Sequence, residues 1–132
     1  MAARLRYLLD THALIWAAVD DDRLGAAAAR TIATTPHDQL AVADISLLEI
    51  SQLLHKGSLA FDVSPGSAFR TMLAHVTVLP ITLDIAIAAP ALALPHGDPY
   101  DRLIVATARI HRLSLVTKDA NILDAELVPT IW

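Results

Sequence analysis

The sequence predicts an α/β protein with a central, mostly parallel sheet of about four or five strands flanked by helices. Short apolar runs of strand length alternate with helical patterns along the chain, an order typical of parallel sheets covered on both faces. The first run, Tyr7-Leu8-Leu9, stops on Asp10, and a helical pattern follows at once. A buried strand, a carboxylate at its end and then a helix is the arrangement by which open α/β sheets present a site.

Apolar and β-branched runs of four to six residues predict the strands, and turn residues bound each of them. Because Pro129 has no N–H to donate to a neighbouring strand, the last strand suits only an edge. The expected strands span residues 5–10, 40–43, 76–79, 114–117 and 128–131.

Start and stop signals predict the helices. Ser64-Pro65 and Asp98-Pro99 each pair an N-cap residue with a proline at the first helical position. Ser46 is expected to open a helix that Gly57 closes, and Pro90 is expected to end or kink the helix that Thr82 caps. The expected helices span residues 12–19, 26–34, 46–56, 65–75, 83–89 and 99–111, with a short helical turn after Asp119.

Composition indicates one domain that spans residues 1–132 and buries a sizeable core, since 55% of the residues are hydrophobic and 18% are charged. The chain has no cysteine, which excludes disulfides and cysteine–zinc sites. No apolar run reaches the ~18 residues of a transmembrane helix, so no membrane partner is expected. Arg4 and Arg6 resemble the start of a signal peptide, but Asp10 and His12 interrupt its apolar part, and we expect a cytoplasmic protein.

Two aspartates directly follow predicted buried strands. These are Asp10 and Asp119, and because parallel strands end at the same edge of a sheet, we expect both carboxylates there. Thr11 and Thr117 flank them with hydroxyls that can orient a carboxylate or a bound water. Each aspartate taken alone is equally well explained as a turn or helix-cap residue.

Two further acids lie on predicted helices. Helix side chains lean toward the N-terminus, so Glu49 points toward the carboxyl end of strand 40–43. The alternative is a capping box in which Glu49 bonds back to Ser46 at the N-cap. Asp101 lies in the first turn of the apolar helix 99–111, where a buried carboxylate needs a partner. For Asp101 the alternative is stabilisation by the helix dipole alone.

Four carboxylates at one edge would repel one another unless a cation lay among them. Two unit charges about 4 Å apart repel by ~4 kcal/mol at an effective dielectric constant of ~20. Oxygen-only ligands favour Mg²⁺ or Mn²⁺ over zinc or copper. Such an ion lowers the pKa of a water and neutralises charge that develops on a phosphate, as phosphodiester hydrolysis requires. We therefore expect metal binding and catalysis by Asp10, Glu49, Asp101 and Asp119.

The net charge of −4 argues at first against a nucleic-acid partner. Once the four proposed ligands are set aside, however, ten acidic residues balance the ten basic ones. There is also no basic run of the kind that marks a strong electrostatic footprint. Composition therefore neither supports nor excludes an RNA substrate. If RNA binds, Lys118 and Arg102 are the nearest candidate contacts for its phosphates.

Five segments, taken in order, resemble the PIN-domain ribonucleases and specifically the VapC-type toxins of bacterial toxin–antitoxin pairs. Together they cover nearly the whole chain, and the ordered set is more specific than any one segment. The segments are YLLDTHALIW (7–16), SLLEIS with the following KG (46–57), LPIT (79–82), PHGDPYDRLIVATA (95–108) and VTKD (116–119).

The resemblance implies a PIN-like α/β fold, Mg²⁺- or Mn²⁺-dependent cleavage of RNA, a homodimer, and a small antitoxin protein that inserts a segment toward the acidic pocket. Carried over residue by residue, the metal-site acids fall on the four named above. Asp98 matches a motif acid that we expect to act as a helix cap or as support for the ligands. Asn121 stands where some relatives have an acid, so the resemblance does not supply a fifth acidic ligand.

Two other functions remain open at this point. A catalytically silent binding module would use its acids only to cap helices. A phosphoaspartyl phosphatase would use Asp10 as its nucleophile, but that chemistry needs a second aspartate two residues on, where His12 stands.

Overall fold

The computed structural model describes residues 4–59, 64–95 and 98–132. His96 and Gly97, which belong to the segment 95–108 quoted above, lie outside the described residues.

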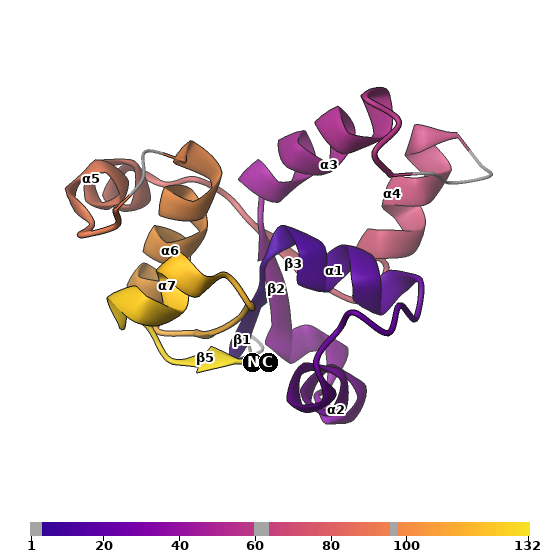
Figure 1. Cartoon of the computed structure of the whole chain (residues 1–132), viewed down its shortest axis with the longest axis horizontal. Coiled ribbons are helices and arrows are strands. Elements are labelled where there is room, and N and C mark those ends of the chain that lie inside the picture. Colours follow the sequence, from indigo (N-terminus) through magenta and orange to yellow (C-terminus); the bar gives the residue numbers. More distant parts are fainter. Residues whose placement is uncertain (1–3, 60–63, 96–97) are drawn as a thin grey trace.

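A five-stranded parallel sheet runs through the centre of the molecule (Figure 1). Its order is β3-β2-β1-β4-β5, and every neighbouring pair is parallel. The predicted fold class is thus confirmed, as is the edge position of the last strand. The strands are β1 (Tyr7–Leu9), β2 (Leu40–Ala43), β3 (Thr77–Leu79), β4 (Ser114–Val116) and β5 (Thr130–Ile131).

The strand order places a crevice at the centre of the sheet. The chain adds β2 and β3 on one side of β1, and then β4 and β5 on the other. In open α/β sheets, ligands bind where the order reverses in this way, outside the carboxyl ends of the strands. Here that point lies between β1 and β4.

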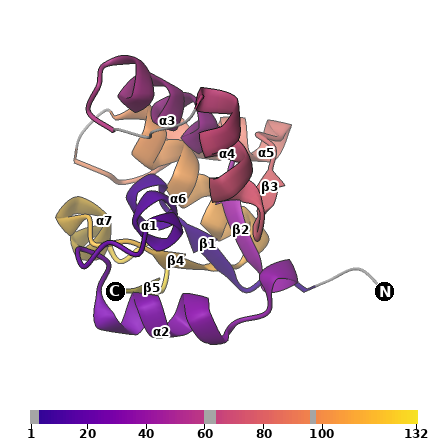
Figure 2. The ribbon, with the colours of Figure 1, turned by 90° about the vertical axis from the view of Figure 1, so that its right-hand side faces the viewer.

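The described residues form seven α-helices, whose limits agree with the sequence predictions to within two residues. Helices α5, α6 and α7 lie on one side of the sheet, and α1, α2 and α4 on the other (Figure 1). The view in Figure 2 places α3 and α4 at one end of the molecule and α2 at the other. The helices are α1 (Thr11–Ala18), α2 (Ala26–Thr34), α3 (Ile45–His55), α4 (Pro65–Leu73), α5 (Leu83–Ala91), α6 (Pro99–His111) and α7 (Ala120–Ala125).

Alternating strand residues divide the core into two layers. Leu9, Val42 and Val116 point into a cluster with α1, α2 and α4. Leu8 and Leu115 point the opposite way, into a cluster with α6 and α7. This two-sided burial explains why the strands are continuously apolar rather than alternating between apolar and polar residues.

Two helix termini differ from the sequence predictions. Helix α3 begins at Ile45 with Asp44 at its N-cap, so the prediction that Ser46 opens this helix is wrong, and the alternative capping box of Ser46 and Glu49 does not form. Ser46 is fully buried, and its hydroxyl accepts a hydrogen bond from the Thr11 hydroxyl at 2.9 Å. Ser46 therefore serves the packing of α1 against α3 and not the cap of α3. Pro90 does not end α5 but lies in its last turn.

Within the described residues, no helix is both long enough and apolar enough to span a membrane.

Candidate active site

The four predicted acids line one cleft of about 280 Å³ at the carboxyl edge of the sheet. They come from four separate parts of the chain. Asp10 follows β1 and Asp119 follows β4, while Glu49 lies on α3 and Asp101 in the first turn of α6. The structure therefore brings together the residues that the sequence singled out.

Asp10 and Asp119 each cap a helix as well as lining the cleft. Asp10 Oδ1 accepts a hydrogen bond from the Ala13 N–H at 2.8 Å, and Asp119 Oδ1 accepts one from the Ile122 N–H at 3.1 Å. These bonds hold each side chain at the start of its helix through one oxygen. The capping role and the site role are therefore compatible, because a carboxylate has a second oxygen.

Two hydrogen bonds tie α3 to its neighbours and so position Glu49. The Thr11–Ser46 bond joins α1 to the first turn of α3. The Tyr100 hydroxyl donates to the Gln52 side-chain oxygen, which joins α6 to α3. Glu49 lies between these two attachments along α3.

Burial and the neighbouring negative charges raise the pKa of two of these acids, Asp101 and Asp10. The pKa of Asp101 rises to about 7, first because burial disfavours the charged form and then because of the negative charges of its acidic neighbours. Burial also raises the pKa of Asp10, an effect opposed by hydrogen bonds from Thr117 and Ala13. The acids that raise the pKa of Asp101 are Asp98, Asp119, Glu49 and Asp10.

The chemistry of this donor set fits a hard divalent cation. All four proposed ligands are carboxylates, and the charge repulsion at Asp101 is what a bound cation would relieve. Within residues 4–59, 64–95 and 98–132, however, no three Asp, Glu or His side chains are already placed to hold one ion. The described acids therefore share one cleft without forming a complete coordination site.

The flanking polar residues have distinct positions. Thr11 lines the cleft, and its buried hydroxyl donates to Ser46 rather than to a carboxylate. The Thr117 hydroxyl accepts from the Asp119 N–H at 3.1 Å and also hydrogen-bonds Asp10. Asp98 lines the cleft and caps α6, accepting from the Tyr100 N–H at 2.9 Å.

The two predicted phosphate contacts separate in the structure. Lys118 lines the acidic cleft. Arg102 does not line it, because its guanidinium donates to the carbonyls of Leu92 at 2.9 Å and Leu94 at 3.0 Å, beyond the end of α5. The geometry therefore favours Lys118 and gives Arg102 a structural role.

Trp132 also lines the cleft, and sequence reasoning missed it. Its carbonyl oxygen accepts from the Ala28 N–H at 2.9 Å, which holds the end of β5 against α2 (Figure 2). No local pattern in the sequence marks this contact between segments so far apart.

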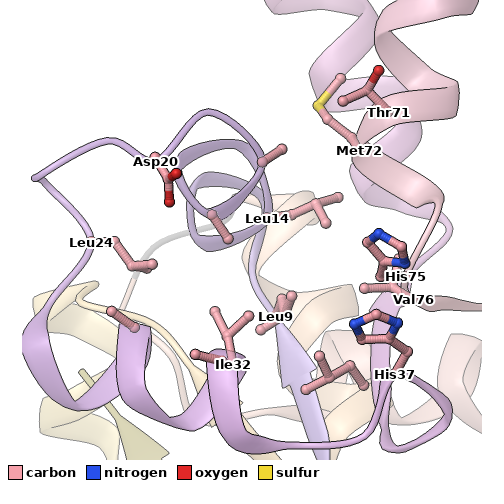
Figure 3. Close-up of a pocket in the computed structure, with 15 residues that line it drawn as sticks. Leu9, Leu14, Asp20, Leu24, Ile32, His37, Thr71, Met72, His75 and Val76 are labelled. Atoms are coloured by element: carbon pink, nitrogen blue, oxygen red, sulfur yellow. The ribbon is translucent and has the colours of Figure 1, made fainter.

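A second cavity, of about 320 Å³, lies between α1, α2 and α4 (Figure 3). It is larger than the acidic cleft, but its walls are mostly apolar, with Leu14, Ile32 and Met72 among them. His37 and His75 stack at its side with ring centroids 4.0 Å apart. Because this cavity lacks a group of carboxylates, the acidic cleft is the candidate for catalysis.

Fold and cleft together define an α/β protein with an acidic site at the switch point of a parallel sheet. The sequence profile of the PIN domain matches residues 7–126. Ribonuclease VapC22 from Mycobacterium tuberculosis is 39% identical over 118 residues, covering 87% of this chain and 88% of the relative. The chain therefore belongs to the PIN-domain family.

Solved structures agree with this assignment. A toxin–antitoxin complex from Klebsiella pneumoniae contains a chain that matches with a TM-score of 0.67 and 26% identity, covering 92% of this chain and 94% of that one. VapBC2 from Rickettsia felis, bound to a promoter DNA fragment, has a TM-score of 0.69 and 14% identity, with coverage of 96% and 97%. At 14% identity, the similarity to VapBC2 shows a shared fold alone.

Proposed function

We propose that this chain is a metal-dependent endoribonuclease and the toxin of a toxin–antitoxin pair, acting as a single domain that spans residues 1–132. The observation that supports it most is the shared cleft of Asp10, Glu49, Asp101 and Asp119, which four separate segments supply. The identity to a ribonuclease over most of the chain supports the reaction class. The likeness to a toxin–antitoxin complex supports the biological role.

In this proposal the four acids hold Mg²⁺ or Mn²⁺ in the cleft. When bound, the ion lowers the pKa of water and neutralises charge on the phosphate. Hydrolysis forms a bond from the water oxygen to phosphorus and breaks one ester P–O bond, whose oxygen leaves with a proton. The acids orient the reacting groups, and the Thr117 hydroxyl, which accepts from the Asp119 N–H, helps to hold Asp119 at the start of α7.

The partners in this proposal are RNA, a cognate antitoxin protein and a second copy of the chain, in the cytoplasm. The antitoxin would block the acidic cleft with an inserted segment. Exposed apolar side chains on α5, such as Leu83 and Ile87, which are 76% and 64% exposed, provide surface that a second copy can bury. Sedimentation equilibrium tests the dimer, and a monomer at micromolar concentration would contradict it.

Incubation with total cellular RNA tests the activity, with Mg²⁺ or Mn²⁺ and with EDTA, followed by mapping of the cleaved ends. We expect discrete cleavage that EDTA abolishes. Asp101→Asn should lower the cleavage rate by at least about 100-fold, because it removes a charged ligand. Asp124→Asn is the matched control, since Asp124 is an exposed acid on α7 outside the cleft, and it should cleave as the wild type does.

A folded wild-type chain without metal-dependent cleavage would support the silent binding module instead. Cleavage that survives Asp101→Asn would show that the acids of the cleft do not perform the reaction.

A further inference from the structure

The acidic cleft has a second set of lining residues with different chemistry. Besides the acids, His12, Lys118 and Trp132 line it. Carboxylates alone repel an RNA strand, whereas a cation beside aromatic rings is the combination with which proteins bind single-stranded nucleic acid. These three residues therefore offer contacts to RNA that the acids alone cannot provide.

One buried tryptophan anchors all three. Trp16 lies on α1 and is 6% exposed. The Lys118 Nζ atom lies 4.7 Å from the centroid of its ring, and the His12 ring lies 5.4 Å away. The Trp132 ring meets it edge-on, with centroids 5.8 Å apart and an angle of 65° between the planes. This shared support fixes the three lining residues relative to one another.

Lys118 keeps its positive charge available. Within the described parts of the chain, Lys118 forms no ion pair with a nitrogen–oxygen distance of 4.0 Å or less, whereas Arg23 pairs with Asp21. Arg23 also lies over Trp16, but its guanidinium is bound to Asp21 at 2.7 Å. A cation–π contact does not neutralise an ammonium group. Lys118 is therefore a cation at the cleft that can bind a phosphate.

Trp132 combines a fixed backbone with partial exposure of the residue to solvent. Its carbonyl is bound by the Ala28 N–H, and its ring packs on Trp16. Gly25 allows this close approach, because a side chain there would overlap Trp132. The residue is nevertheless only half-buried. A ring already held in place loses little conformational freedom when a base stacks on it.

We propose that Trp132 stacks on a nucleobase of the RNA while Lys118 binds the adjoining phosphate. A base inside a duplex is covered by its neighbours, whereas loops and single strands offer bases that can stack on a protein ring. This inference rests on the proposed nuclease function for the role of the acids. It adds which two residues hold the RNA strand beside the acids.

Intrinsic fluorescence tests the stacking directly, because Trp16 and Trp132 are the two tryptophans of the chain. The full chain is titrated in EDTA, which prevents metal-dependent cleavage, with a single-stranded RNA dodecamer of mixed sequence. We expect the single strand to quench the emission and the matching duplex not to do so. Trp132→Phe should lose the quenching but keep a dissociation constant within about threefold of the wild type, because a ring remains. Trp132→Leu should weaken binding by about tenfold or more.

The contact of Lys118 has its own readout in the salt dependence of binding. Lys118→Gln should lower the slope of log affinity against log salt by about 0.7, the value for one phosphate contact on a single strand. Lys56→Gln is the matched control, since Lys56 is the other lysine and is exposed outside the cleft. It should leave the slope unchanged.

The outcomes separate this proposal from a structural role and from the nuclease proposal. A folded Trp132→Leu variant with a lower melting temperature but the wild-type RNA affinity would overturn the stacking role. So would duplex RNA that binds as tightly as the single strand. If the wild type binds and is quenched but never cleaves RNA with Mg²⁺ or Mn²⁺, the nuclease proposal fails while the stacking site stands.

Discussion

Gly25 shows how one absent side chain positions the cleft residue Trp132. A Cβ atom at Gly25 would overlap the Trp132 carbonyl and lie 2.5 Å from its Cδ1 atom. Gly25→Ala should therefore lower the free energy of unfolding by about 1–3 kcal/mol, through steric overlap rather than backbone strain, since the φ angle of −63° suits any residue. Urea unfolding followed by tryptophan emission measures the change.

Gly66→Ala is the matched control. A Cβ atom there would meet nothing closer than an Arg70 side-chain nitrogen at 3.7 Å, and the residue lies inside α4. Because alanine favours helix, stability should stay the same or rise by up to about 1 kcal/mol. Equal effects of the two substitutions would contradict the role assigned to Gly25.

The raised pKa of Asp101 predicts a pH dependence of stability in the metal-free protein. The carboxyl loses its proton near pH 4 in the unfolded chain but only near pH 7 in the folded one. Between these values the folded state binds more protons, so its stability falls as pH rises and levels off above about pH 7. In Asp101→Asn this contribution is absent.

Urea unfolding in EDTA at several pH values between about 4 and 8 checks this prediction. The stability of the variant relative to the wild type should increase as pH rises. Parallel profiles for the two proteins would show that Asp101 titrates normally.

At the scale of elements, Arg102 ties α6 to the segment that follows α5. Its guanidinium donates hydrogen bonds to the carbonyls of Leu92 and Leu94. These carbonyls follow the end of α5 and have no partner within a helix. Arg102→Met keeps the aliphatic stem but removes the donors, and should cost about 1–3 kcal/mol of stability. Unfolding by urea measures the loss, while the KM for RNA should stay within about twofold of the wild type.

Arg109→Met provides the comparison on the same helix, because Arg109 is exposed. It should change stability by less than about 0.5 kcal/mol. A large rise in KM for Arg102→Met, with wild-type stability, would instead return Arg102 to the role of phosphate contact.

For the whole molecule, metal binding should couple to folding because the four ligands come together only in the folded chain. At a Mn²⁺ concentration of about 100 times its dissociation constant, the ion should add about 2.7 kcal/mol to stability. Thermal unfolding with and without Mn²⁺ measures the shift. Asp10→Asn should remove most of it, and an unchanged shift in that variant would contradict the proposed ligand set.

Much of the site could be predicted because the geometry of parallel sheets is general. Asp10 and Asp119 follow strands that end at one edge, and the lean of helix side chains directs Glu49 toward it. The bonds of Arg102 to the carbonyls after α5 could not be predicted, because those carbonyls belong to another element. Ser46 was assigned to a cap because its partner, Thr11, is remote in the sequence.

By itself, the sequence determined the alternation of strands and helices, the limits of most elements and the four candidate ligands. Apolar periodicity and helix caps act over a few residues, so they can be recognised locally. Only the tertiary structure decided that Trp132 and Lys118 share Trp16 beside the acids, and that an apolar cavity opens between α1, α2 and α4. Such contacts depend on which distant segments pack together, and no local pattern of residues encodes that choice.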